Sequence, residues 1–346
     1  MVINSKELIL NRTWLQNSLN EFLRRRGKEI IQSDRVYDWQ RDTTKPHYRG
    51  LELPQEASCY LRSNNPKLLD LKRRYSAFNP DVTTPMVWNE GHLRDEDIPY
   101  FRGDNAYVWQ VRGQNMNILG YALAYYYLKA IDQLNLFDRM SEDGAFGNFT
   151  FRVANRDVSR DLLDSVAEIL FLERHLNVSN IANLTILDIG AGYGRLAHRA
   201  TQAWPNLRSY LCADAVPHST FISDFYLRHR EVGNKAAVIP LDEIQTALGS
   251  QRIDLAVNIH SFSECQLAAI DWWVDLIAKN GVRHLMVVPN VTDAAGEQLL
   301  TNDRRDFRPL LEKRGYRLIV GEPKYLDPVI HQYAIQPSMH FLFGLV

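Results

Sequence analysis

The residues best suited to binding chemistry are three glycines that follow an aspartate. Asp188 ends an apolar run, and Gly190, Gly192 and Gly194 follow at alternate positions. Glycines let a backbone turn tightly, and the N-terminus of the next helix can face a ligand. The spacing is one residue shorter than the dinucleotide fingerprint, which disfavours a pyrophosphate and hence a nicotinamide oxidoreductase. We interpret the stretch as a site for a nucleoside-like ligand whose uncharged or cationic part lies over the turn. The alternative is a turn that needs glycine for its backbone alone.

Two later strand ends carry acids that suit the same kind of ligand. Asp214 follows the apolar run 211–213, where a carboxylate can accept hydrogen bonds from both ribose hydroxyls. Leu241 and Asp242 follow the next run, so an apolar side chain could stack on adenine while the acid accepts from its amino group. The alternative for both acids is capping of the helices that follow them.

The elements that must position these residues begin at residue 184. Short apolar runs alternate there with helical patterns, which predicts a parallel sheet with helices on both faces. A ligand should then lie beyond the carboxyl ends of the strands. The predicted strands are 185–189, 209–213, 236–239, 253–257, 284–288, 316–321 and 339–345, and the predicted helices are 194–204, 217–230, 241–248, 265–279 and 303–314.

The chain before the sheet follows a different pattern. Helical periods alternate there with irregular stretches, and the aromatic and charged segment 88–109 indicates a packed loop. We predict an N-terminal, mainly helical cap at 1–157 and a sheet domain at 158–346. The helical stretches are 5–31, 66–76, 115–137 and, with Ser159 as its cap, 160–176.

Charge and cysteine usage limit the classes of partner. Forty basic and 41 acidic residues give a formal net charge of −1, so no basic excess points to nucleic acid or to a membrane surface. Cys59, Cys212 and Cys265 are too widely spaced for a disulfide framework or a zinc site, which indicates reduced thiols. No apolar run reaches about 18 residues, and the N-terminus lacks a signal-peptide pattern. We expect a cytoplasmic protein that binds neither nucleic acid nor membrane.

The glycine turn, Asp214 and the Leu241–Asp242 pair together resemble the cofactor motifs of class I S-adenosylmethionine-dependent methyltransferases. That fold is a Rossmann-like parallel sheet with an antiparallel last strand. A second likeness, to a family of sugar O-methyltransferases, extends from about residue 85 onward. It implies an enzyme that transfers a methyl group from S-adenosylmethionine to a hydroxyl of a sugar or a glycosylated metabolite. The blocks that carry this likeness are 101–107, 158–165 and 258–264.

The reactive centre is expected at the end of the fourth strand. Methyl transfer to a hydroxyl is an in-line displacement that needs alignment and a group to take the hydroxyl proton. An ordinary histidine titrates near neutrality, so His260 is our candidate base, although a lone histidine after a strand is more often structural. Glu264 could orient the imidazole, bind acceptor hydroxyls or cap the next helix. The expected cofactor ligands are Asp188, Gly190, Gly192, Gly194, Asp214, Leu241, Asp242, Asn258 near the methionine part, and Phe146 from a loop that folds over the cofactor.

The acceptor site is expected in the N-terminal cap. Asp104, Asn105 and Tyr107 combine hydrogen-bonding groups with an aromatic face, which suits a polyhydroxylated ring. The alternative is a core loop with buried polar groups. The expected partner is a small-molecule acceptor, and a homodimer is left open.

No essential metal is predicted. Asp188 and Asp214 are committed to the cofactor, and no acidic pair follows the fourth or fifth strand. Two other functions stay open. One is methylation of a non-sugar secondary metabolite, and the other is that of a catalytically silent, methyltransferase-like binding or scaffold protein.

Overall fold

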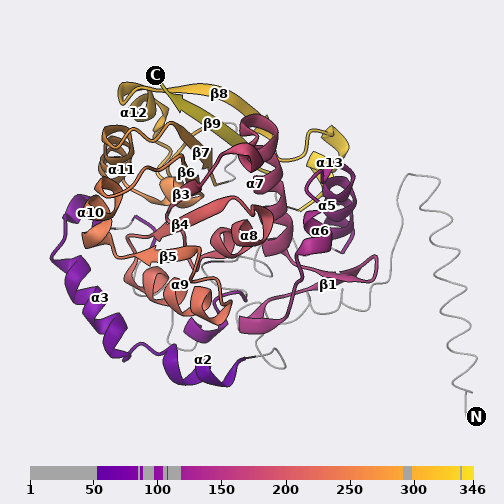
Figure 1. The fold of residues 1–346 in the computed structure, drawn as a ribbon, viewed down its shortest axis with the longest axis horizontal. Helices are drawn as coiled ribbons and strands as arrows, with labels where there is room; N and C mark the ends of the chain where they lie inside the picture. The colour runs from indigo at the N-terminus through magenta and orange to yellow at the C-terminus, as the bar shows by residue number, and fades with distance from the viewer. Residues whose placement is uncertain are drawn as a thin grey trace, which may run out of the picture. The chain divides into compact units, whose positions relative to one another are not determined.

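A seven-stranded sheet forms the centre of the part that the computed structural model describes, residues 53–84, 86–88, 97–103, 107, 118–290, 298–335 and 337–346. Its strands are β3 (Leu184–Ile189), β4 (Leu207–Ala213), β5 (Ala236–Ile239), β6 (Leu255–Ile259), β7 (His284–Val288), β8 (Tyr316–Pro323) and β9 (Met339–Leu345). They lie in the order β5-β4-β3-β6-β7-β9-β8 (Figure 1). Neighbouring strands are parallel from β5 to β7, whereas β9 runs antiparallel to both of its neighbours.

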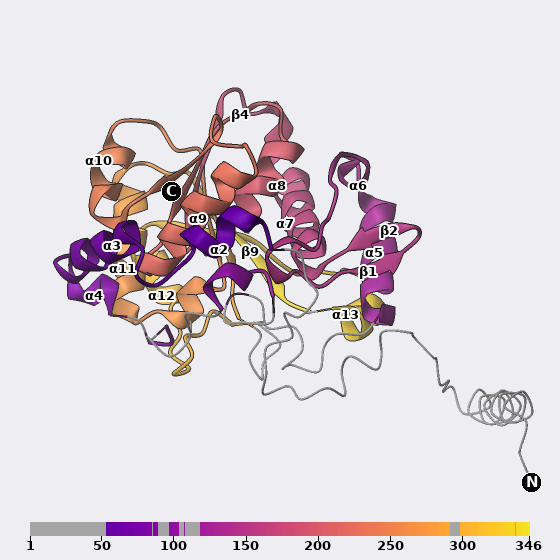
Figure 2. The ribbon, with the colours of Figure 1, turned by 90° about the horizontal axis from the view of Figure 1, so that it is seen from below.

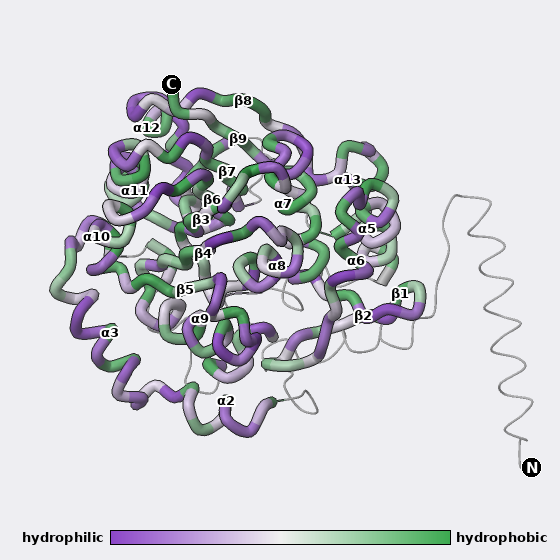
Figure 3. The backbone as a smooth tube through the Cα atoms, viewed as in Figure 1, coloured by the Kyte–Doolittle hydropathy of each residue, from purple (hydrophilic) through white to green (hydrophobic). Residues whose placement is uncertain are grey.

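The mostly parallel sheet and its antiparallel last strand, β9, are those predicted, so the predicted fold class is confirmed. Every residue of β3 is buried. A parallel strand is covered on both faces, which explains its mostly apolar sequence. In Figure 3 the neighbouring strand β6 is mostly hydrophobic, whereas β4 is hydrophilic near its start and hydrophobic at its end. The bounds of β5, β7 and β9 are those predicted, and β6 begins two residues later than predicted.

Helices cover both faces of the sheet. They are α7 (Arg160–Leu176), α8 (Arg195–Ala203), α9 (Pro217–His229), α10 (Ile244–Gly249), α11 (Leu267–Lys279) and α12 (Arg308–Lys313), with the 3-10 helices η4 (Val178–Asn180), η5 (Leu241–Glu243) and η6 (Ser261–Glu264). α7 and α8 lie on one side and α10, α11 and α12 on the other (Figures 1 and 2). The Oγ of Ser159 accepts a hydrogen bond from the N–H of Leu162 at 3.0 Å, which confirms the predicted cap of α7. The predicted helix 265–279 begins only at Leu267, because Cys265 and Gln266 are extended.

Part of the N-terminal region crosses the sheet domain as a strap. It consists of α2 (Gln55–Tyr60), α3 (Pro66–Ser76) and α4 (Pro80–Thr83), and we call residues 53–84 the N-terminal strap. α3 packs on α9 and α4 packs on α11, so the strap links two helices of the sheet domain (Figure 2). An exposed ion pair joins Lys67 Nζ to Asp224 Oδ2 at 2.6 Å. The bounds of α3 are those predicted.

Other N-terminal elements pack beside α7. They are η2 (Ile98–Tyr100), α5 (Ile118–Ile131), α6 (Leu136–Arg139), η3 (Ala145–Gly147) and the hairpin of β1 (Phe151–Val153) and β2 (Arg156–Val158), and α13 (Pro328–Tyr333) joins them from the C-terminal region. α5 contacts both α7 and α13. The predicted helix 115–137 is divided into α5 and α6 by residues 132–135, and Asn135, just before α6, has a positive φ of 54°. The predicted helix 5–31 lies outside the described residues, and the domain boundary near residue 157 stays a prediction.

The sequence pattern does not predict the hairpin of β1 and β2. Strands of three residues are too short for a recognisable alternation. The turn residues Ala154 and Asn155 have φ values of 49° and 61°. Positive φ at both positions is what a two-residue hairpin turn requires.

Candidate functional site

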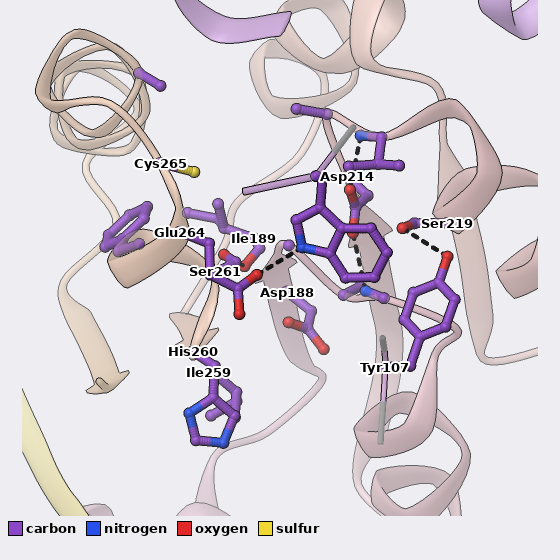
Figure 4. Close-up of a pocket in the computed structure, with 18 of the residues that line it drawn as sticks. Tyr107, Asp188, Ile189, Asp214, Ser219, Ile259, His260, Ser261, Glu264 and Cys265 are labelled. Carbon is purple, nitrogen blue, oxygen red and sulfur yellow. Dashed lines mark hydrogen bonds between the residues drawn. The ribbon is translucent and has the colours of Figure 1, made fainter. Parts of the chain in front are cut away.

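A cavity lies where the carboxyl ends of β3, β4 and β6 meet, at the edge of the sheet where the sequence places the ligand (Figure 4). Its walls come from the sheet domain and from the N-terminal region, which contributes Val82 to Thr84 of the strap together with Trp88. The predicted site residues that line the cavity are Tyr107, Asp188, Gly190, Gly192, Asp214, His260 and Glu264.

The glycine turn is shaped by close packing at two positions. Gly190 has a φ of +74°, and a Cβ added to it would lie 2.0 Å from the Oγ of Ser261. Gly194 has a φ of +85°, and its Cβ would lie 2.8 Å from the Oγ of Ser223. A side chain is therefore excluded at both positions. Gly194 is not among the residues that line the cavity, and its role in the structure is the close packing of α8 on α9.

Asp214 ties the end of β4 to the glycine turn. Its Oδ2 accepts from the N–H of Gly192 at 3.0 Å, and its Oδ1 accepts from the N–H of Val216 at 2.8 Å. Burial raises the pKa of Asp214 to about 7, although these two N–H donors oppose the shift. The side chain of Ser219 also donates to this carboxylate. Each carboxylate oxygen has two acceptor positions, so a ligand can use the position that these three donors leave.

Asp188 is the second buried acid of the cavity. The hydroxyl of Tyr210 donates to its Oδ2 at 2.9 Å. Burial raises the pKa of Asp188 to about 7, and the bond to Tyr210 opposes that shift. A small change of environment is enough to switch the charge of this acid, and a cationic ligand would favour its ionised form.

His260 lies at the end of the cavity away from Asp214 (Figure 4). Its backbone has a positive φ of 66°, between β6 and η6. Its Nδ1 is 3.3 Å from the carbonyl oxygen of Pro289. A carbonyl can only accept, so Nδ1 carries the proton and Nε2 keeps a lone pair. Burial, together with the charge of Arg160, lowers the pKa of His260 to about 4, so the imidazole is neutral at physiological pH.

Glu264 is held in place from two sides. The indole N–H of Trp88 donates to its Oε2 at 2.6 Å (Figure 4). The Nδ2 of Asn290 donates to its Oε1 at 3.1 Å. Neither of these donors is on the helix that Glu264 precedes. Its side chain therefore joins Trp88 and the end of β7 across the cavity wall, and its backbone ends η6.

Tyr107 lies against the cofactor turn predicted from the sequence. Its hydroxyl shares a hydrogen bond of 3.0 Å with the Oγ of Ser219, at the start of α9 (Figure 4). A Cβ on Gly192 would be 3.6 Å from its ring, and its ring centroid is 4.9 Å from that of Trp88. Burial raises the pKa of Tyr107. Asp104 and Asn105, the other predicted acceptor residues, lie outside the described residues.

Four further predicted residues do not line the cavity. Asn258 is fully buried, and its side chain binds the backbone of Ile189 and Phe262, which ties β6 to β3. Asp242 forms an ion pair with Arg74 of the strap at 2.8 Å.

The two remaining residues are apolar and packed in the interior. Leu241 is buried, and its N–H donates to the hydroxyl of Tyr75 at 2.9 Å. The ring of Phe146 stacks on that of Phe101. The cofactor roles of these four residues stay predictions.

The cavity also includes residues that the sequence pattern does not single out. Arg160 and Trp88 are among them. Arg160 lies within a block similar to sugar O-methyltransferases, which is a signal that could have identified it. Trp88 reaches the cavity through tertiary packing alone.

The described part of the chain holds no group of three or more His, Cys, Asp or Glu side chains that could bind a metal ion. None of its helices is both long enough and apolar enough to span a bilayer. The absence of an essential metal from the reaction stays a prediction.

Comparisons with known proteins give structural likenesses only. No family model matches the sequence, and no curated protein matches it. The cyclase SpnF is 13% identical over 64% of this chain and 93% of its own, with a TM-score of 0.39. Magnesium protoporphyrin IX methyltransferase from Synechocystis PCC 6803, solved with bound SAM, is 12% identical over 65% of this chain and 97% of its own, with a TM-score of 0.37. Mitomycin 7-O-methyltransferase is 16% identical over 54% of this chain and 56% of its own, with a TM-score of 0.37. The function must therefore be argued from the site residues themselves.

Proposed function

We propose that this protein is an S-adenosylmethionine-dependent O-methyltransferase that acts on a hydroxyl of a sugar or a glycosylated metabolite. The observation that carries the proposal is that one cavity holds the glycine turn, Asp214 and the neutral imidazole of His260. The turn and the acid suit an adenosyl ligand, and the imidazole can take a proton from a hydroxyl.

The residues present are chemically suited to this cofactor. Asp214 would accept from the ribose hydroxyls with the acceptor capacity that its two N–H donors and Ser219 leave. Gly190 and Gly192 would let the backbone approach the ligand without a side chain between them. Asp188 would balance the cationic charge of the cofactor. When bound, S-adenosylmethionine supplies an electrophilic methyl group on a sulfonium.

His260 is the proposed general base. Its Nδ1 is directed to the carbonyl of Pro289, so Nε2 is the atom that would take the hydroxyl proton. Because its pKa is lowered, the imidazole is neutral and can accept a proton, but it is also a weak base. Proton transfer should therefore accompany attack of the oxygen on the methyl carbon, and it should not precede that attack.

The acceptor would lie between the N-terminal region and η6. Trp88 and Tyr107 provide aromatic faces for the C–H groups of a sugar ring, and Glu264 provides carboxylate oxygens for its hydroxyls. Because Trp88 and Asn290 already hold Glu264 in place, little side-chain entropy would be lost when an acceptor binds it.

The test is a methyl-transfer screen with methyl-tritiated S-adenosylmethionine over nucleotide sugars and glycosylated extracts. We expect label in a sugar-containing product, formed with an equal amount of S-adenosylhomocysteine. The matched control is the His260→Gly variant. Glycine tolerates the positive φ at this position, so the variant should bind S-adenosylhomocysteine normally. Label in a non-sugar product would contradict the acceptor assignment, and binding without any transfer would favour the silent binding protein. Absence of binding to S-adenosylhomocysteine would overturn the whole proposal.

A further inference from the structure

Tyr193 lies inside the glycine turn, yet its hydroxyl is not directed to the backbone of the turn. The residue lines the cavity and is only 4% exposed. Its hydroxyl donates to the Oδ2 of Asp161, in the first turn of α7. A residue of the proposed cofactor turn is thus fixed to a carboxylate of a different element.

Asp161 is in turn held by a buried arginine. The Nε of Arg102 donates to the same Oδ2 at 3.2 Å, and the Arg102 side chain is fully buried. Arg102 also pairs with Glu142 at 2.6 Å and with Asp143 at 2.8 Å. Burial alone would raise the pKa of Glu142, but the charges of Arg102 and Arg199 lower it to about 2, so it is ionised. We call Arg102, Glu142, Asp143, Asp161 and Arg199 the Arg102 network.

The ring of Tyr193 contacts the same N-terminal segments that carry the network. Its centroid is 5.1 Å from that of Phe101, next to Arg102, and 6.0 Å from that of Tyr107. On the side of the sheet domain, it is 5.4 Å from the ring of Tyr226 in α9. Both the ring and the hydroxyl of Tyr193 are therefore fixed by residues outside the turn.

We propose that Tyr193 is a positioning residue of the cofactor site: its bond to Asp161, supported by Arg102, holds the turn between Gly192 and Gly194 in the shape that binds the adenosyl cofactor. This inference rests on the cofactor part of the proposed function and is independent of the acceptor. Without the hydroxyl bond, the free protein can adopt other turn conformations, and binding must then select the competent one.

The test measures S-adenosylhomocysteine affinity in Tyr193→Phe by isothermal titration calorimetry, well below the melting temperature. We expect a dissociation constant about tenfold higher than that of the wild type, with an unchanged binding stoichiometry. Arg102→Lys keeps the charge but cannot reproduce the guanidinium geometry. This variant should also raise the dissociation constant, although Arg102 does not line the cavity. The matched control is Tyr316→Phe, which removes another buried hydroxyl, one that donates to the carbonyl of Val282. This control should bind as the wild type does.

A double-mutant cycle separates positioning from general destabilisation. If Tyr193 acts through Asp161, then adding Tyr193→Phe to Asp161→Ala, which removes the acceptor, should raise the dissociation constant by much less than tenfold. A lower melting temperature with an unchanged dissociation constant in Tyr193→Phe would show a merely structural role and would overturn the inference. Failure of the wild type to bind S-adenosylhomocysteine would remove the cofactor assignment and this inference together. A changed dissociation constant with no methyl transfer to any sugar would support the inference and contradict the acceptor assignment.

Discussion

Cofactor affinity should depend on pH through Asp214. Its pKa in the free protein is raised to about 7, so about half of the molecules carry a protonated Asp214 at pH 7. Ribose hydroxyls donate best to the ionised form, so a bound cofactor should select the carboxylate. The apparent dissociation constant should then rise as pH falls through 7, and it should be about tenfold higher at pH 6 than at pH 8. This change corresponds to about 1.4 kcal/mol.

The assay is isothermal titration calorimetry of S-adenosylhomocysteine at pH 6, 7 and 8. Repeating each titration in buffers of different ionisation enthalpy counts the protons released, and we expect about half a proton per ligand at pH 7. Asp214→Asn should bind more weakly at every pH and should lose this pH dependence. Asp188 also has a pKa raised to about 7, so Asp188→Asn is the comparison that assigns the effect. The Asp188→Asn variant should keep the pH dependence, because Asp214 is unchanged in it.

Two results would refute this reasoning. A wild-type dissociation constant that changes less than twofold between pH 6 and pH 8 would mean that the ligand does not select the ionised form. A pH dependence that survives in Asp214→Asn and disappears in Asp188→Asn would assign the titrating group to Asp188. The exposed acid Asp157, on β2, provides the control, since Asp157→Asn should alter neither affinity nor pH dependence.

Three further predictions follow from the site and from the Arg102 network. His260→Gly should lower turnover by about 10²–10⁴ in single-turnover kinetics while leaving S-adenosylhomocysteine affinity intact, and normal turnover would remove His260 from the mechanism. Glu264→Gln should raise the KM for the acceptor about tenfold with little change in cofactor affinity. Initial rates at varied acceptor concentration measure this KM, and a change in cofactor affinity alone would assign Glu264 to the cofactor. Arg102→Ala should lower the free energy of unfolding in urea by about 3–5 kcal/mol, because buried Asp161 loses its cation and buried Glu142 keeps only Arg199. By contrast, Arg152→Ala breaks an exposed pair on the hairpin and should change the free energy of unfolding by less than about 1 kcal/mol. Equal effects of the two variants would show that burial of the Arg102 pairs does not increase their contribution to stability.

The sheet and its glycine turn could be predicted because both depend on local patterns. A buried parallel strand has a continuous apolar sequence, and its last residue marks the edge where a ligand can bind. The predicted strand ends bring Asp188, Asp214 and His260 to one edge of the sheet, and all three residues line the cavity there. The spacing of the glycines predicted a turn without side chains, and the contact between Gly190 and Ser261 gives the physical reason.

The parts that could not be predicted depend on residues far apart in the sequence. Asp242 follows its strand as expected, but Arg74 from the strap pairs with its carboxylate at the surface. Asn258 also follows its strand, yet its amide is used to join β6 to β3. Local periodicity does not reveal which group a polar side chain will bind. It therefore could not predict that Trp88 bonds to Glu264.

The Arg102 network crosses the boundary predicted at residue 157. Arg102 and Glu142 lie before it, Arg199 lies after it, and their side chains are at most 2% exposed. A chain that began at residue 158 would keep Arg199 but lose its carboxylate partner, and a buried charge left alone costs several kcal/mol. The sheet domain is therefore not expected to be an autonomous folding unit. The segments before it supply part of its interior, so both should unfold in one cooperative transition.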